Sequence, residues 1–214
     1  VESLLLVNDE LVRQAALTAD VTAAIIASLG VGNWRHASAT LLRHALKLTQ
    51  SEYGFIGFVL VPGRLRVLAH EGVVWDQTTS TNREFYENTL NAYTEVGYLE
   101  FPRLDNLFGR VIASGNTILS NDAAHDPLSS GRLPPGHPPL RQFLGVPAKH
   151  QGEVVGMIGI ANRDGGYREY DQRQVEALST IVGSLYASYG RHLRVSELEE
   201  QLRVSQARLV EVLE

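Results

Sequence analysis

This 214-residue chain contains seven histidines, whose imidazole rings could bind a metal ion or a haem. Two of them, His125 and His137, lie in a segment rich in proline and glycine. No two histidines have the H-x-H or H-E-x-x-H spacing that directs two imidazoles at one ion, so we expect no metal site. A haem would need one imidazole directed into an apolar cavity, and the sequence leaves that alternative open.

The sequence lacks most of the residues on which enzymes depend. It contains no cysteine, which excludes a disulfide, a thiol nucleophile, a cysteine-bound zinc or iron–sulfur cluster, and a tetrapyrrole linked through cysteine. There is no G-x-S-x-G motif and no glycine loop of the type that binds phosphate. His192 lacks the acidic neighbour and the following proline of a phospho-accepting kinase histidine. We therefore expect this segment not to be catalytic.

The charge pattern indicates which partners to expect. The formal net charge is −5, and the two lysines are Lys47 and Lys149. No cluster of basic residues interleaved with aromatic ones is present, so we expect no nucleic-acid partner. No apolar run approaches the ~20 residues of a membrane span, and residues 3–7 are too short for a signal-peptide core. We therefore expect no membrane contact within this segment and a cytoplasmic location.

The elements that would position any site follow one another as in an α+β domain. Helices are predicted at 9–29 and 33–50, strands at 54–61 and 65–70, a helical insertion within 73–101, a short helix at 106–114, a strand at 117–120, an irregular loop at 121–140, strands at 143–148 and 154–161, and a long helix at 171–214. The strand at 154–161 is apolar on both faces, which requires cover on both sides of the sheet. We predict a central antiparallel sheet with helices on one face and a layer of loops on the other.

Three stretches of the C-terminal half resemble a GAF domain: G-R-V-I-A-S-G-N-T-I-L-S-N-D (109–122), L-P-P-G-H-P-P-L-R-Q-F-L-G-V-P (133–147) and G-E-V-V-G-M-I-G-I-A-N-R (152–163). The order of the elements extends the resemblance to residues 9–189. It implies a GAF-like sensor domain that packs its N- and C-terminal helices on one face of the sheet and binds a small molecule under the loops of the other. It also implies a multi-domain bacterial signalling protein, of the sensor histidine kinase or cyclic-dinucleotide enzyme type.

One motif within this resemblance carries both a basic and an acidic residue. Asn162-Arg163, Tyr167 and Asp171-Gln172 are similar to the N-K…F-x-x-x-D-E motif of GAF domains that bind cyclic nucleotides, with Arg, Tyr and Gln in place of Lys, Phe and Glu. Arg163 and Asp171 would form an ion pair between the end of a strand and the start of a helix. We favour a structural clamp over nucleotide binding.

The resemblance places a ligand cavity beside the helical insertion and the long loop. We expect seven residues to bind the ligand: Trp75, Phe85, Tyr93 and Phe143 as aromatic walls, with Asn121, Asp122 and Arg132 as polar contacts. The alternative is that the aromatic residues form plain core and that Asn121 and Asp122 make only turn hydrogen bonds. The sequence identifies neither the ligand nor a cofactor.

The long C-terminal helix changes its pattern partway along. Up to residue 189 its apolar residues have the spacing of a helix packed on a domain. From Val195 the apolar and small residues follow a heptad: Val195, Leu198, Leu202, Ser205, Leu209 and Val212. Residues 190–214 therefore predict a coiled-coil helix in a parallel homodimer, with the change of pattern at residues 190–192. The chain begins without Met and ends within this pattern, so we expect a segment of a longer protein with a downstream kinase or cyclase module.

Three functions remain as alternatives. The first is a regulatory sensor that binds a small ligand, or a dimerising relay, and that transmits a conformational change through the C-terminal helix. The second is a ligand-free dimerisation or spacer domain whose own side chains fill the pocket. The third is a sensor of noncovalently bound haem or another tetrapyrrole.

Overall fold

The computed structural model describes residues 19, 21–23, 25–26, 32–101 and 104–213, with the side chains of 209–213 excepted. Its elements are α2 (Trp34–Thr49), β1 (Ser51–Val61), β2 (Arg64–Glu71), α3 (Ser80–Val96), β3 (Leu99–Phe101), α4 (Leu107–Ser114), β4 (Ile118–Ser120), β5 (Phe143–His150), β6 (Glu153–Arg163) and α5 (Glu169–Leu213). The helix predicted at 9–29 lies largely outside the described residues, of which 19, 21–23 and 25–26 are helical.

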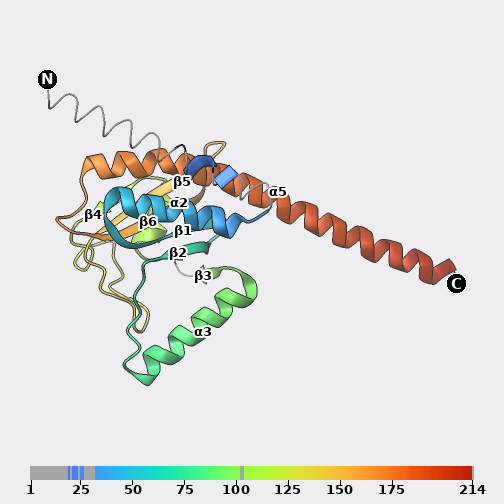
Figure 1. Cartoon of the computed structure of the whole chain (residues 1–214), viewed down its shortest axis with the longest axis horizontal. Helices are drawn as coiled ribbons and strands as arrows, with labels where there is room; N and C mark the ends of the chain where they lie inside the picture. The colour runs from blue at the N-terminus through green and yellow to red at the C-terminus, as the bar shows by residue number, and fades with distance from the viewer. Residues whose placement is uncertain (1–18, 20, 24, 27–31, 102–103, 214) are drawn as a thin grey trace.

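The six strands form one sheet in the order β3-β2-β1-β6-β5-β4, and every neighbouring pair is antiparallel. The long strands β1 and β6 pair at the centre, with Ile56 opposite Ile158. Helices α2 and α5 lie side by side over one face, and α3 lies beyond the β2–β3 edge (Figure 1). The predicted α+β architecture is confirmed.

Local sequence sets the ends of the helices. Asn33 caps α2, since its side chain accepts a hydrogen bond from the backbone N–H of His36 at 3.1 Å. Asn106 caps α4 in the same way through the N–H of Gly109 at 3.0 Å. Gly115 ends α4 with φ +64°, a left-handed conformation that glycine adopts at little cost. These polar caps explain why both helices begin where the sequence predicted.

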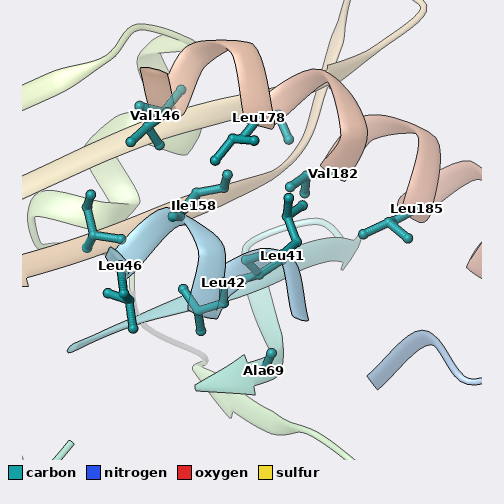
Figure 2. Packing of buried hydrophobic residues seen from close by; sticks show 14 of the residues in the cluster. Leu41, Leu42, Leu46, Ala69, Val146, Ile158, Leu178, Val182 and Leu185 are labelled. Carbon is teal, nitrogen blue, oxygen red and sulfur yellow. The ribbon is translucent and has the colours of Figure 1, made fainter. Parts of the chain in front are cut away.

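The larger core lies between the sheet and the layer formed by α2 and α5. Leu41 and Leu42 of α2, Ile158 of β6, and Val182 and Leu185 of α5 are fully buried there and point toward one another (Figure 2). Complete burial of one such side chain stabilises the fold by roughly 1.5–3 kcal/mol. This helix layer is the cover that the predicted strand at 154–161 requires on its first face.

The opposite face of the sheet has a smaller core and a different cover. Leu107 and Val111 of α4 pack with Phe143, Met157 and Leu65 in a second apolar cluster. Residues of the loop 121–140 and of α3 also line this face, and α3 lies within the predicted insertion at 73–101 and has no buried residue. The two faces of the sheet are therefore packed to different degrees.

Helix α5 continues beyond the domain as a single exposed rod (Figure 1). Residues 186–190 are partly buried and residues 191–208 are exposed, so the change of sequence pattern at 190–192 marks the point where the helix leaves the domain, and the helix continues through it. Val195, Leu198 and Leu202 are 51%, 52% and 59% exposed in this single chain. Among the described residues, no helix is long and apolar enough to cross a membrane.

Candidate ligand-binding site

A cavity of about 680 Å³ lies on the less packed face of the sheet, within the ~300–1,000 Å³ range of small-molecule sites. It is bounded by β1, β2 and β3, by α3, and by the loop 121–140. Its walls are mostly apolar and aromatic; they include Tyr53, Phe55, Leu65, Val67, Trp75, Phe85, Tyr86, Tyr93, Tyr98, Phe101, Phe108, Leu140 and Phe143. The shape and the walls fit a mainly apolar molecule.

Helix α3 forms one wall of the cavity. Phe85, Thr89, Tyr93 and Val96 line it at helical spacing, and Ala92 lies on the same face. None of them is buried, and Val96 is 57% exposed. The apolar side of α3 therefore faces open volume, whereas the apolar sides of α2 and α5 face packed core.

One end of the cavity is a group of rings that includes a histidine. The ring of His137 meets those of Tyr53 and Trp75 edge-on, with both centroid distances 5.4 Å, and Trp75 also lies 5.8 Å from Phe85. The Nδ1 atom of His137 lies 2.7 Å from the carbonyl oxygen of Pro138. Because a carbonyl only accepts, Nδ1 carries the proton, and Nε2 of the neutral ring is left as an acceptor. Burial lowers the pKa of His137, which keeps the ring neutral at pH 7.

A second histidine lines the cavity where Tyr93 of α3 contacts β2. The ring of His70 lies 4.8 Å from that of Tyr93, whose hydroxyl donates a 2.8 Å hydrogen bond to the carbonyl of Leu68. The guanidinium of Arg35 lies 4.3 Å from the same tyrosine ring. Burial lowers the pKa of His70, so this ring is also neutral at pH 7. Tyr93 thus links α3 to both the sheet and α2.

In the part of the chain that the structure describes, the lining contains two charged side chains, Glu100 and Arg132. The carboxylate of Glu100 accepts hydrogen bonds from Arg64 at 2.6 Å and Arg66 at 3.0 Å, and these bonds lower its pKa. Among the described residues, the guanidinium of Arg132 has neither an ion-pair nor a hydrogen-bond partner. Within this part of the chain no three His, Asp or Glu side chains meet as a metal-ligand group.

Of the predicted site residues, the structure brings Trp75, Phe85, Tyr93, Phe143 and Arg132 to one cavity. It does not bring Asn121 or Asp122 there. The side chain of Asn121 bonds to the backbone of Tyr167, and Asp122 lies 2.8 Å from His125 Nδ1 in an exposed turn. Asp122 thus takes a turn partner, as in the alternative interpretation, whereas Asn121 makes a long-range contact that neither interpretation predicted.

Sequence reasoning missed His70 and Tyr53, and it considered His137 for haem without including it among the ligand-binding residues. For His70 the signal was the register of the β1–β2 hairpin, which places His70 opposite Phe55 and hence on the face that carries the cavity. A β-bulge between Ile56 and Gly57 shifts this register by one residue, because Ile56 pairs with Ala69 and Gly57 with Val67. Alternation counted along the sequence therefore assigns His70 to the wrong face.

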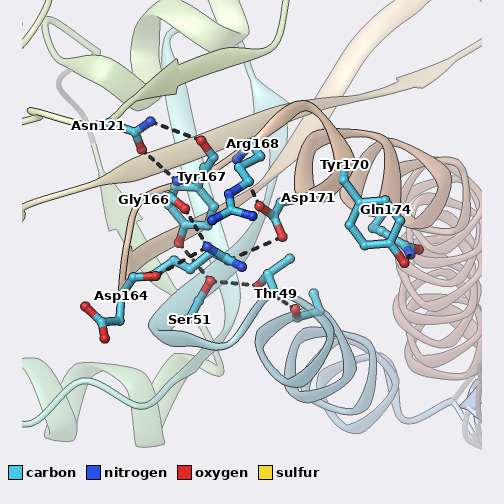
Figure 3. Close-up of polar contacts among 12 residues, drawn as sticks. Thr49, Ser51, Asn121, Asp164, Gly166, Tyr167, Arg168, Tyr170, Asp171 and Gln174 are labelled. Carbon is cyan, nitrogen blue, oxygen red and sulfur yellow. Dashed lines mark hydrogen bonds and ion pairs between the residues drawn. The ribbon is translucent and has the colours of Figure 1, made fainter.

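The predicted clamp joins the end of β6 to the start of α5. Arg163 Nε lies 3.3 Å from Asp171 Oδ1, with the two side chains 17% and 5% exposed. The other carboxylate oxygen of Asp171 accepts from the backbone N–H of Arg168 at 2.9 Å, in the first turn of α5. Nη1 of Arg163 also donates to the carbonyl of Gly166 at 2.6 Å (Figure 3). Arg163 and Asp171 are therefore paired with each other and with the backbone, although Nε of Arg163 is buried without a hydrogen-bond partner among the described residues.

Tyr167 extends the clamp to further parts of the fold. Its backbone N–H and C=O both bond to the amide of Asn121, at 2.7 and 3.0 Å. Its hydroxyl lies 2.7 Å from Ser51 Oγ, which lies 2.7 Å from Thr49 Oγ1, and Thr49 donates to the carbonyl of Ala45 in α2 (Figure 3). Burial raises the pKa of the Tyr167 phenol. The motif thus links the end of β6 and the start of α5 to α2, to β1 and to the residue that follows β4.

Asn162 fixes the end of the long loop. It has φ 59° and is buried, and its Oδ1 accepts from the N–H of Arg141 at 2.9 Å. Its Nδ2 donates to Glu52 Oε2 and to the carbonyl of Pro139, both at 2.9 Å. The loop that carries His137 is therefore attached to the sheet at its C-terminal end.

An antiparallel sheet with helices on one face and a cavity under a loop layer on the other defines an α+β domain of the regulatory GAF type. The family profile described as "GAF domain" matches residues 34–185. The chain belongs to the GAF domain family, whose members are typically signalling and sensory modules of bacterial proteins.

Solved structures share this fold at low sequence identity. The GAF domain of a phosphoenolpyruvate-protein phosphotransferase from Coxiella burnetii matches with TM-score 0.65 and 18% identity over 86% of this chain and 96% of that chain. A free methionine-R-sulfoxide reductase from Neisseria meningitidis, in complex with its substrate, matches with TM-score 0.60 and 11% identity over 84% and 91%. The GAF domain of an Acinetobacter phosphoenolpyruvate-protein phosphotransferase matches with TM-score 0.58 and 13% identity over 82% and 96%. These identities establish a common fold alone.

Proposed function

We propose that this GAF domain is a sensor module that binds a small, mainly apolar molecule under α3 and transmits binding to α5. The observation that carries the proposal is the 680 Å³ cavity, whose α3 wall presents an apolar face with no buried residue. A ligand that covers Phe85, Tyr93 and Val96 would gain about 25 cal/mol per Å² of apolar surface removed from water. Ligand binding therefore supplies contacts that α3 lacks in the unliganded chain.

A line of ring contacts supports transmission from the cavity to α5. Arg35, at the start of α2, lies over the ring of Tyr93, which lines the cavity. Its neighbour Trp34 stacks on His192 at 4.3 Å and lies 5.8 Å from Tyr189, where α5 leaves the domain. A ligand that moves α3 would change the Arg35 contact and, through the first turn of α2, the packing around His192. Binding then favours one of two arrangements at the base of the rod.

The exposed rod would pair with a second copy. Val195, Leu198 and Leu202 form an apolar stripe with steps of three and four residues, and all three are about half exposed. Such a stripe suits a parallel two-helix seam, in which each residue packs into the partner helix. The output of the parent protein, whether a kinase or a cyclase, would receive the change in this seam.

The test uses the chain's lack of cysteine. A Ser196→Cys variant carries one labelling site per chain, on the exposed part of α5, and reports the distance between two copies by electron-spin resonance. Small molecules extracted from the purified protein, or found in a thermal-shift screen, are then added. We expect a raised melting temperature and an altered spin–spin distance, and both should be lost in Phe85→Ala. A ligand-free spacer domain would give neither response.

Noncovalent haem is the second candidate, and it is favoured by the geometry of His137. The Pro138 carbonyl holds the proton on Nδ1, so the neutral ring presents Nε2 as the free ligand atom within an apolar cavity. Haem added to the purified protein should then give a sharpened and shifted Soret band that is lost in His137→Ala. An unchanged spectrum of free haem would reject this candidate.

A further inference from the structure

The charged groups around the cavity are unevenly balanced. Within the described part of the chain, Glu100 is the one carboxylate in the lining, and it is paired with two arginines, Arg64 and Arg66. Arg132 adds a guanidinium for which the described residues supply no counter-charge. Asp76, which follows the lining residue Trp75 in sequence, accepts hydrogen bonds from the N–H of Thr78 at 2.9 Å and from the amide of Asn82. The cavity is therefore mostly apolar within, and of its two described charged side chains Glu100 is already paired whereas Arg132 is not.

The two histidines do not change this balance. His70 and His137 are both buried enough for their pKa values to be lowered, so each ring is neutral at pH 7. The positive charge at the loop side of the cavity thus comes from Arg132, which directly precedes the lining residues Leu133 and Pro134. Arg132 is exposed, and it can therefore meet a ligand at the mouth without first being desolvated.

We propose that the ligand is an amphipathic carboxylic acid, whose apolar body lies under α3 and whose carboxylate is paired with Arg132. A guanidinium binds a carboxylate through two parallel N–H···O bonds, which fixes the orientation of the molecule. One unpaired guanidinium matches one negative charge, whereas a phosphate monoester would bring about −1.5 to −2. The inference rests on the proposed ligand-binding function, and it goes further by giving the charge and the orientation of the ligand.

The test compares acids with their own amides. Naphthalene-2-carboxylic acid, indole-3-acetic acid and decanoic acid, each with its primary amide, are titrated into the whole chain by calorimetry at pH 7.5. Each pair shares its apolar body and differs in charge. We expect the acid of at least one pair to bind about tenfold more tightly than its amide, as one charge-assisted bidentate contact would give. This preference should fall as salt is raised.

Variants assign the preference to one residue. Arg132→Gln should weaken binding of the acid about tenfold and leave the amide unchanged, whereas Phe85→Ala should weaken both. Arg110→Gln is the matched control, because Arg110 is exposed on α4 and is not a lining residue. Equal binding of acid and amide, or an unchanged acid affinity in Arg132→Gln, would overturn the carboxylate inference while the ligand-binding function stands. Failure of all six compounds to bind would overturn both.

Discussion

The ion pair between Arg163 and Asp171 gives a quantitative test, because the same helix offers a second pair at the same distance. Arg163–Asp171 and Arg173–Glu169 both have a 3.3 Å separation between nitrogen and oxygen. The first pair is 17% and 5% exposed, and the second is 65% and 89% exposed. Any difference in their contribution to stability therefore comes from burial rather than from distance.

The expected energies follow from these numbers. At 3.3 Å the gross Coulomb attraction is about 5 kcal/mol at an effective dielectric constant of ~20, and about 1.3 kcal/mol in water. Asp171→Asn also weakens the charge-assisted bond to the N–H of Arg168 and removes a negative charge from the first turn of α5. Since Arg163 keeps its bond to the Gly166 carbonyl, we expect a net loss of about 3 kcal/mol rather than the full penalty for an isolated buried charge.

The assay is urea unfolding of two double-mutant cycles. Asp171→Asn with Arg163→Gln should give a coupling energy of about 2–3 kcal/mol, and Glu169→Gln with Arg173→Gln should give about 0.3–0.5 kcal/mol. The single Asp171→Asn variant should lower the melting temperature by about 6–12 °C, the range for a domain of this size. In 1 M NaCl the exposed coupling should vanish while the buried one persists. Coupling energies within ~0.5 kcal/mol of each other would refute the argument from burial.

Three further predictions concern the cavity, the rod and the helix layer. Phe85→Ala should cost less than about 1.5 kcal/mol in urea unfolding of the unliganded protein, because Phe85 is only partly buried, whereas the fully buried Leu42→Ala should cost about 2–5 kcal/mol. Leu198→Ala with Leu202→Ala should shift sedimentation from dimer to monomer. Burial lowers the pKa of His44, so the unfolded chain takes up a proton on this residue at a higher pH than the folded chain does. The urea midpoint should therefore fall as pH drops below about 6.5. This fall should be smaller in His44→Leu.

Each of these predictions has a control and a contradicting outcome. Equal destabilisation by Phe85→Ala and Leu42→Ala would mean that α3 is packed core. Ser196 is not one of the predicted seam residues, so Ser196→Ala should leave the dimer intact. A dimer that is unaffected by the Leu198→Ala and Leu202→Ala double substitution would reject the coiled coil. If the urea midpoint of His44→Leu has the same pH dependence as that of the unaltered chain, His44 is not a group whose pKa burial lowers.

Much of the framework could be predicted from short stretches of sequence. Asn33 and Asn106 caps, the Pro62-Gly63 turn and the glycine at 115 fix element ends, because each acts within a few residues of its own position. The two-faced apolar pattern of β6 correctly required cover on both sides. The aromatic residues of the insertion were correctly grouped with the loop, since residues of both segments line one cavity.

The polar part of the site was less predictable. Asn121 and Asp122 have side chains that suit a pocket, a turn or a backbone partner equally well, and their partners depend on how Tyr167 and His125 are placed. His70 was missed because the bulge in β1–β2 reverses the alternation that would have assigned its face. The spacing of residues along the sequence does not reveal a β-bulge, because the bulge exists only in the pairing of two strands.

The sequence alone determined the α+β class, the absence of cysteine chemistry and the change of pattern along the last helix, because composition and periodicity are local properties of the chain. Only the tertiary structure decided that α3 faces a cavity, that His70 and His137 line it together, and that His192 stacks on Trp34 across 158 residues of sequence. These contacts depend on how separate elements pack against one sheet. The physical reason is that the free energy of such a contact depends on two residues far apart in the chain, so the sequence around either residue alone does not predict the contact.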